Sequence, residues 1–164
     1  TVEALLAAGA DSNAVLMTGE TVLMRASFSG DLDTVDLLLE HGADPLATGT
    51  GYTALQAAVM RGDLELVQAL LSRGANPNAR LTKGPPVRRA SADYGLSGYF
   101  VGATPIWLAA RYAEPEIMQV LASSGANAST ESRQASRTLS RFDQWFTGAI
   151  SLRETVRGSP RERE

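Results

Sequence analysis

A glycine-containing tripeptide recurs along the chain at nearly constant spacing, and this spacing limits the possible folds more than any other feature. The copies follow apolar helical stretches at Gly9-Ala10-Asp11, Gly42-Ala43-Asp44, Gly74-Ala75-Asn76 and Gly125-Ala126-Asn127. Their glycines lie 33, 32 and 51 residues apart, and the last interval equals one period of 33 plus 18 inserted residues. A fixed period of about 33 predicts that one supersecondary unit is stacked several times.

A second motif keeps the same period. It reads Gly19-Glu20-Thr21-Val22-Leu23, Gly51-Tyr52-Thr53-Ala54-Leu55 and Gly102-Ala103-Thr104-Pro105-Ile106. Each threonine is placed to cap the start of a helix, and Pro105 fits a first helical turn. The glycines of the first motif fall just past a second helix, where a left-handed backbone ends it. Apolar residues at helical spacing, such as Val35 and Leu38, are expected to pack between neighbouring units.

Together the motifs resemble the ankyrin repeat, whose family pattern runs G-x-T-P-L-H-x-A-A, then G-x-L-E-I-V-x-L-L-L, then G-A-D. The resemblance covers residues 1–128. It implies an all-α ankyrin-repeat solenoid of stacked helix-turn-helix units with short β-hairpin-like finger loops. The units expected are a half repeat at 1–14 and repeats at 15–47, 48–79 and 80–128, the last with an insertion at about 80–101.

The histidine of the family pattern is missing from all three copies. Met24, Gln56 and Trp107 stand in its place. Because that histidine ties neighbouring repeats by hydrogen bonds, its loss is expected to loosen the stack. The one histidine, His41, lies at the predicted end of a second helix, where a cation is favoured by the helix dipole, and it has no partner residues for a metal or catalytic role.

Two segments depart from the pattern. The insertion combines cations with aromatics, at Arg80, Lys83, Arg88, Arg89, Tyr94, Tyr99 and Phe100. It is either a solvated loop that lengthens one finger or an element that contacts a partner. Residues 129–164 contain seven arginines and five acidic residues. Their apolar spacing is compatible with a helix over about 138–149 that caps the last repeat before a disordered tail. The alternative is that the array continued and this segment is a truncated end, disordered from about Arg157.

The resemblance also implies a binding surface made of finger tips and first helices, the concave side of such arrays. The finger positions are Met17, Thr18, Glu20, Thr50, Tyr52, Phe100 and Val101, and the helix positions are Phe28, Ser29, Met60, Arg61, Arg111 and Tyr112. Aromatic residues, methionine and arginine are typical of interface centres. Phe28 and Met60 are equally compatible with packing between repeats.

No pattern points to catalysis. The chain has no cysteine, one histidine and no nucleotide-binding or nucleophile motif. Acidic pairs such as Asp31 with Asp33, and Asp63 with Glu65, open predicted helices, where carboxylates favour the positive dipole end. We therefore expect a non-catalytic protein-binding module with no cofactor, metal or small-molecule substrate.

Charge leaves one alternative open. Residues 1–130 hold 8 basic and 13 acidic residues, whereas the remaining 34 hold 7 and 5. Nucleic acid is thus an unlikely partner for the repeats, although the basic insertion and the arginine-rich tail are compatible with binding an acidic partner or nucleic acid. No apolar run is long enough to span a membrane. A cytoplasmic location is slightly favoured, with an upstream signal left open because the chain starts at Thr1, inside a predicted helix.

Overall fold

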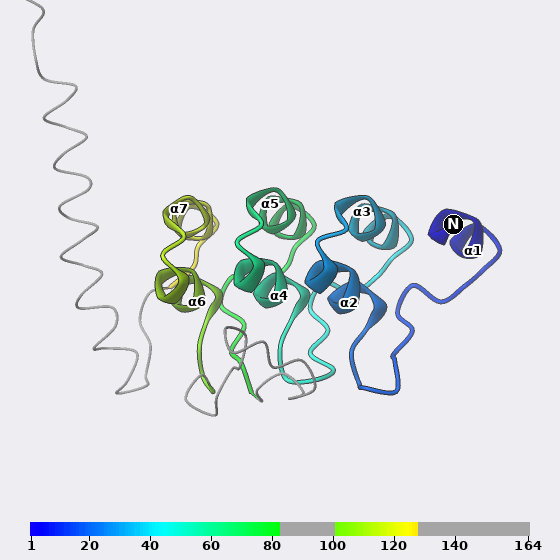
Figure 1. The fold of residues 1–164 in the computed structure, drawn as a ribbon, viewed down its shortest axis with the longest axis horizontal. Coiled ribbons are helices and arrows are strands. Elements are labelled where there is room, and N and C mark those ends of the chain that lie inside the picture. Colours follow the sequence, from blue (N-terminus) through cyan, green and yellow to red (C-terminus); the bar gives the residue numbers. More distant parts are fainter. Residues whose placement is uncertain (83–100, 128–164) are drawn as a thin grey trace, which may run out of the picture.

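The helices of the chain lie in two rows. The computed structural model describes residues 1–82 and 101–127, and within these ranges it contains helices but no strand. The first helices, α2, α4 and α6, lie side by side, and the second helices, α1, α3, α5 and α7, form the other row (Figure 1). The predicted all-α solenoid of stacked helix pairs is confirmed. The helices are α1 Val2–Ala7, α2 Val22–Ser29, α3 Leu32–Glu40, α4 Ala54–Arg61, α5 Leu64–Ser72, α6 Pro105–Tyr112 and α7 Pro115–Ser123.

The helix starts follow the predicted caps with one exception. The hydroxyls of Thr21 and Thr53 accept hydrogen bonds from the backbone N–H groups three residues later, at 3.2 and 3.3 Å. Thr104 occupies the same position before α6, but its side chain makes no capping hydrogen bond within the described residues, so this part of the prediction was wrong. Pro105 follows it in the first turn and has no N–H that needs a cap.

The second helices begin at acidic caps. Asp31 accepts hydrogen bonds from the backbone N–H of Thr34 at 3.0 Å and from its hydroxyl at 2.7 Å, and these bonds lower the pKa of Asp31. Asp63 caps α5 in the same way through the N–H of Leu66, at 3.1 Å. The acidic residues at these helix starts therefore have a structural role.

The turns inside the helix pairs require a left-handed residue. Gly30 and Gly62 take this conformation, with φ of 75° and 73°. In the last pair, Ala113 stands at the equivalent position with φ of 60°, and it is the one non-glycine residue with positive φ in the described part of the chain. A left-handed alanine costs roughly 1–2 kcal/mol, so this turn is strained relative to the other two.

The hydrophobic core lies between the two rows and between successive pairs. Leu55 on α4 and Val67 on α5 are fully buried, as are Leu23 and Val35 at the equivalent positions of α2 and α3. Burial of such a side chain contributes about 1.5–3 kcal/mol. Because each pair shares its apolar surface with its neighbours, stability is distributed along the stack as nearest-neighbour contacts.

At one of the three positions that lack the family histidine, Gln56 supplies hydrogen bonds between units. Its side-chain N–H groups donate to the carbonyl oxygens of Ala79 and Ala103, at 3.0 and 3.3 Å, and its Oε1 accepts from the N–H of Thr53 at 2.9 Å. The side chain is fully buried. A primary amide carries two donors and one acceptor group, and all three functions are used here.

Asparagines tie neighbouring units on the side of the second helices. Asn13 donates to the carbonyl of Gly42 at 3.0 Å and accepts from the N–H of Asp44 at 2.7 Å. Asn78 repeats both bonds, at 3.0 and 2.7 Å, with the last unit. Leu46 holds the equivalent position between these two and is exposed, so the middle junction lacks this tie.

The finger loops have hairpin-like pairing at two places. Val15 and Thr21 form an isolated antiparallel bridge. Leu81 accepts a hydrogen bond from the N–H of Gly102 at 2.6 Å and donates to the carbonyl of Ala103 at 2.9 Å. The body of the insertion, including Phe100, and the expected capping helix at 138–149 lie outside the described residues.

Candidate binding face

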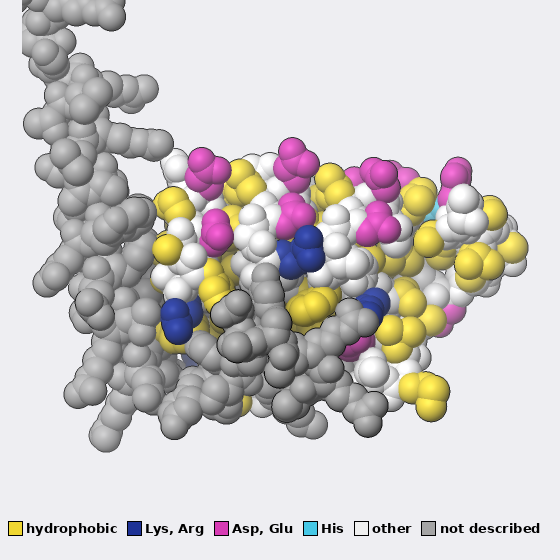
Figure 2. Space-filling model, in the orientation of Figure 1, with side chains coloured by type: hydrophobic (Ala, Val, Ile, Leu, Met, Phe, Trp, Pro, Cys, Tyr) yellow, Lys and Arg dark blue, Asp and Glu magenta, His cyan; other side chains and the backbone are white. Residues whose placement is uncertain are grey.

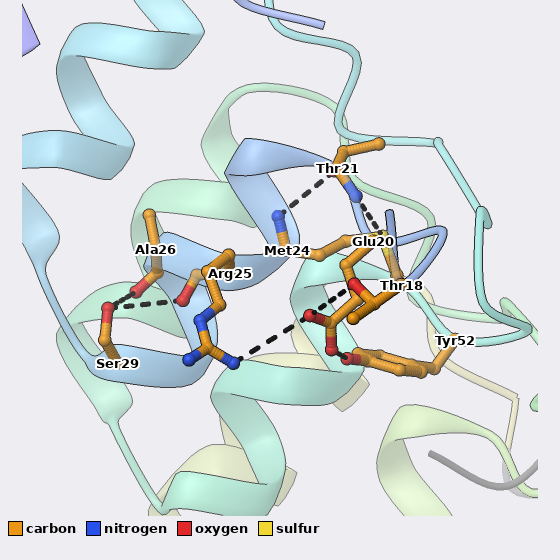
Figure 3. Close-up of polar contacts among 8 residues, drawn as sticks. All are labelled: Thr18, Glu20, Thr21, Met24, Arg25, Ala26, Ser29 and Tyr52. Carbon is orange, nitrogen blue, oxygen red and sulfur yellow. Dashed lines mark hydrogen bonds and ion pairs between the residues drawn. The ribbon is translucent and has the colours of Figure 1, made fainter. Parts of the chain in front are cut away.

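A buried polar cluster joins the first finger to the second (Figure 3). The Tyr52 hydroxyl donates to Glu20 Oε1 at 2.5 Å, and the Thr18 hydroxyl donates to Glu20 Oε2 at 3.3 Å. Arg25 approaches the same oxygen at 3.9 Å. Glu20 is only 7% exposed and Tyr52 only 1%, so these two side chains offer little surface to a partner.

The environment of Tyr52 keeps its hydroxyl protonated. Burial is the main cause, and the hydrogen bond and negative charge of Glu20 add to it, so that the pKa of Tyr52 is raised well above the ordinary tyrosine value of 10.0. The hydroxyl thus remains a donor throughout the physiological pH range. The contact belongs to the structure that holds the fingers together.

The other predicted finger residues differ in their exposure. Met17 is fully exposed and Val101 is half exposed, whereas Thr50 is partly buried. Met17 follows two more exposed apolar residues, Val15 and Leu16. The tip of the first finger therefore exposes three apolar side chains in succession.

The first helices present the remaining predicted positions. Ser29, Arg61 and Arg111 are exposed, and Phe28 and Tyr112 are partly buried. Met60 is 6% exposed, in agreement with the packing alternative for this residue. We call the exposed or partly exposed set the first-helix face, and it consists of Arg25, Phe28, Ser29, Arg61, Arg111 and Tyr112.

Arg61 bridges two units of this face. Its Nη1 donates to the carbonyl oxygen of Phe28 at 3.0 Å, near the end of α2. The guanidinium lies so close to Gly30 that a Cβ built on this glycine would meet it at 2.5 Å. Arg61 is consequently held in place across the junction while its exposed edge faces solvent.

Arg25 belongs to this face but does not follow from the family positions. Its side chain is 46% exposed. It precedes Phe28 by three residues and Ser29 by four on α2, and residues at these spacings share one side of a helix. The helical spacing is the signal that identifies it.

The described residues do not form a recognisable reactive site. His41 is exposed at the end of α3, where its Nδ1 donates to the carbonyl of Leu37 at 2.8 Å. No group of three or more His, Cys, Asp or Glu side chains is arranged to hold a metal within residues 1–82 and 101–127. None of the helices in these ranges has the length and apolar character needed to cross a membrane.

Comparison with models of protein families identifies the repeat. A family model described as ankyrin repeats (3 copies) matches residues 1–80, which include α1 to α5. The pair α6 and α7 lies beyond the matched range and is stacked on α4 and α5 in the same manner (Figure 1). A search among curated proteins finds no matching relative.

Proposed function

Since this chain is an ankyrin-repeat protein, a family whose members are generally non-catalytic protein-interaction modules, we propose that it binds another protein through the first-helix face together with the tip of the first finger. The observation that carries this proposal is the composition of that face. Exposed or partly exposed arginine and aromatic side chains succeed one another across α2, α4 and α6. These residue types are enriched where binding energy is concentrated.

The opposite row supports the same assignment by contrast. In α3, α5 and α7 the exposed positions are mostly acidic or amide side chains, for example Glu40, Glu65 and Gln68. Charged residues such as glutamate and lysine are depleted at interface centres. A partner that covers arginine and aromatic side chains is therefore expected to bind the row of first helices and not the row of second helices.

An affinity capture with paired variants tests this proposal. Arg111→Ala combined with Tyr112→Ala removes two side chains of the first-helix face, and Glu65→Ala combined with Gln68→Ala changes two exposed positions on α5. Both proteins are first checked for an unchanged circular dichroism spectrum. We expect the first variant to lose partners that the unaltered chain retains and the second to keep them. Equal retention by both would contradict the assignment.

The alternative surface, formed by the basic insertion and the tail, is distinguished by the same assay. If it carries binding, Arg88→Gln with Arg89→Gln abolishes capture and the affinity falls steeply with salt. If the first-helix face carries binding, this variant changes little.

A further inference from the structure

The two helix rows carry charges of opposite sign. The first helices contain no acidic residue and one arginine each, at Arg25, Arg61 and Arg111. The second helices α3, α5 and α7 contain acidic residues and no basic one. Figure 2 shows most of the visible acidic side chains over the row of second helices, with the visible basic side chains below them.

Helix dipoles explain only part of this separation. Acidic residues at the starts of the second helices, such as Asp31, are accounted for as caps. Arg61 and Arg111 lie in the last turns of α4 and α6, where the dipole favours a cation by about 0.3–1 kcal/mol. Arg25 lies in the first half of α2, where the dipole does not favour it. The complete absence of carboxylates from all three first helices also needs another reason.

The three guanidinium groups are available to an anionic ligand. The side chain of Arg25 is 46% exposed, and its contact with Glu20 is a long one of 3.9 Å. Arg61 uses one nitrogen on the carbonyl of Phe28 and is otherwise exposed, as is Arg111. A guanidinium binds a carboxylate through two parallel hydrogen bonds, which makes arginine well suited to recognise acidic side chains.

The spacing of the row matches an extended peptide. Packed helices lie about 8–10 Å apart, and an extended chain in the polyproline II conformation repeats every three residues, or about 9 Å. A peptide that crosses α2, α4 and α6 thus brings every third side chain over the next helix. The partly exposed aromatic rings of Phe28 and Tyr112 lie on the same face and can contact the residues between.

We propose that the first-helix face recognises an extended acidic peptide segment, with carboxylates about three residues apart that pair with Arg25, Arg61 and Arg111. This proposal rests on the protein-binding function proposed above and specifies the chemistry of the partner. The acidic second-helix row repels the broad negative surface of a nucleic-acid duplex or an anionic membrane but leaves room for a narrow peptide.

Selection from a random dodecapeptide display library on the immobilised full chain tests the proposal. Peptides are kept if they bind the unaltered chain but do not bind a variant with both Arg25→Gln and Arg111→Gln. We expect the kept peptides to be enriched in Asp and Glu at intervals of three residues. Enrichment without acidic residues, or with acidic residues at no fixed interval, would overturn the proposal.

Affinity measurements on the selected peptide provide the matched control. By fluorescence polarisation, Arg25→Gln and Arg111→Gln should each weaken binding about three- to tenfold. Arg73→Gln removes the same charge from the end of α5, outside the first-helix face, and should have less than a twofold effect. An equal loss of affinity for all three variants means non-specific electrostatic attraction and contradicts the proposal. A single-stranded oligonucleotide of equal charge that binds the same arginines more tightly than the selected peptide would also contradict it.

The two proposals fail in different ways. If the variant with Arg111→Ala and Tyr112→Ala loses its captured partners while the selected peptides carry no acidic pattern, the first-helix face binds proteins of another chemistry. If capture is unaffected by that variant, the face itself is wrongly assigned.

Discussion

The Tyr52 hydroxyl donates a hydrogen bond of 2.5 Å to the Glu20 carboxylate, 32 residues earlier in the chain, and both side chains are buried. The bond joins two successive fingers. If the Glu20 carboxylate loses this donor, it remains buried and its desolvation is no longer compensated. Breaking the pair therefore costs more stability than the net value of one hydrogen bond.

Tyr52→Phe should lower the free energy of unfolding by about 1–3 kcal/mol, because Glu20 loses its buried donor. Urea denaturation followed by circular dichroism measures the change. A double-mutant cycle with Glu20→Gln isolates the contribution of the pair. Additive effects of the two substitutions would show that the contact carries no coupling.

Stability should fall at high pH through Tyr52. Its pKa is raised in the folded state above the ordinary value of 10.0, so it contributes full stability below about pH 10, and this contribution is lost as the unfolded chain ionises at higher pH. The difference in unfolding free energy between the unaltered chain and Tyr52→Phe should therefore shrink from about pH 10 upward. A constant difference between pH 8 and 11 would contradict the raised pKa.

Gln56→Leu should destabilise the stack by about 2 kcal/mol or more, because the carbonyl oxygens of Ala79 and Ala103 lose their donors. Met24→Leu at the equivalent position of α2 is the control. The sulfur of Met24 makes only a weak contact of 3.5 Å with the N–H of Thr21, so this exchange should cost less than about 1.5 kcal/mol. Thermal unfolding of both variants compares them directly.

Leu46→Asn should stabilise the protein by about 1 kcal/mol, because it supplies the side-chain hydrogen bonds that are missing between the units at 15–47 and 48–79. The new amide would bond to the carbonyl of Gly74 and the N–H of Asn76, as Asn13 and Asn78 do at their own junctions. The reverse exchange, Asn13→Leu, should destabilise by a similar amount. A fall in melting temperature for Leu46→Asn would show that the junction does not accept the pair.

Ala113→Gly should stabilise the last helix pair by about 1 kcal/mol, because glycine adopts the left-handed conformation without a Cβ clash. Ala110→Gly, inside α6, should instead destabilise by about 1 kcal/mol. If the two exchanges change the free energy of unfolding in opposite directions, the effect at Ala113 is due to backbone strain and not to a general effect of glycine. Chemical denaturation gives both values.

The repeat and its turns were predictable because their signals are local. Gly42 and Gly74, for instance, end helices through the backbone of their own turn, and Asp31 caps the helix that follows it. Such features depend on a few neighbouring residues, which a single period of sequence contains.

The contacts between units were not predictable in the same way. The family pattern places Glu20 and Tyr52 in the binding surface, yet both are buried here and bond to each other across two units. The role of Gln56 also depends on carbonyl groups 23 and 47 residues away. Pairings at these separations depend on how the repeats stack, and spacing alone does not specify them.

The backbone pairing of Leu81 with Gly102 and Ala103 has a consequence for how this scaffold can change. It clamps the two ends of the intervening stretch together, and each doubling of a clamped loop adds only about 0.6 kcal/mol of closure entropy. This position is therefore expected to tolerate the insertion of additional residues. We expect an epitope or a small domain with adjacent termini to be accommodated here without a change in the register of the surrounding array.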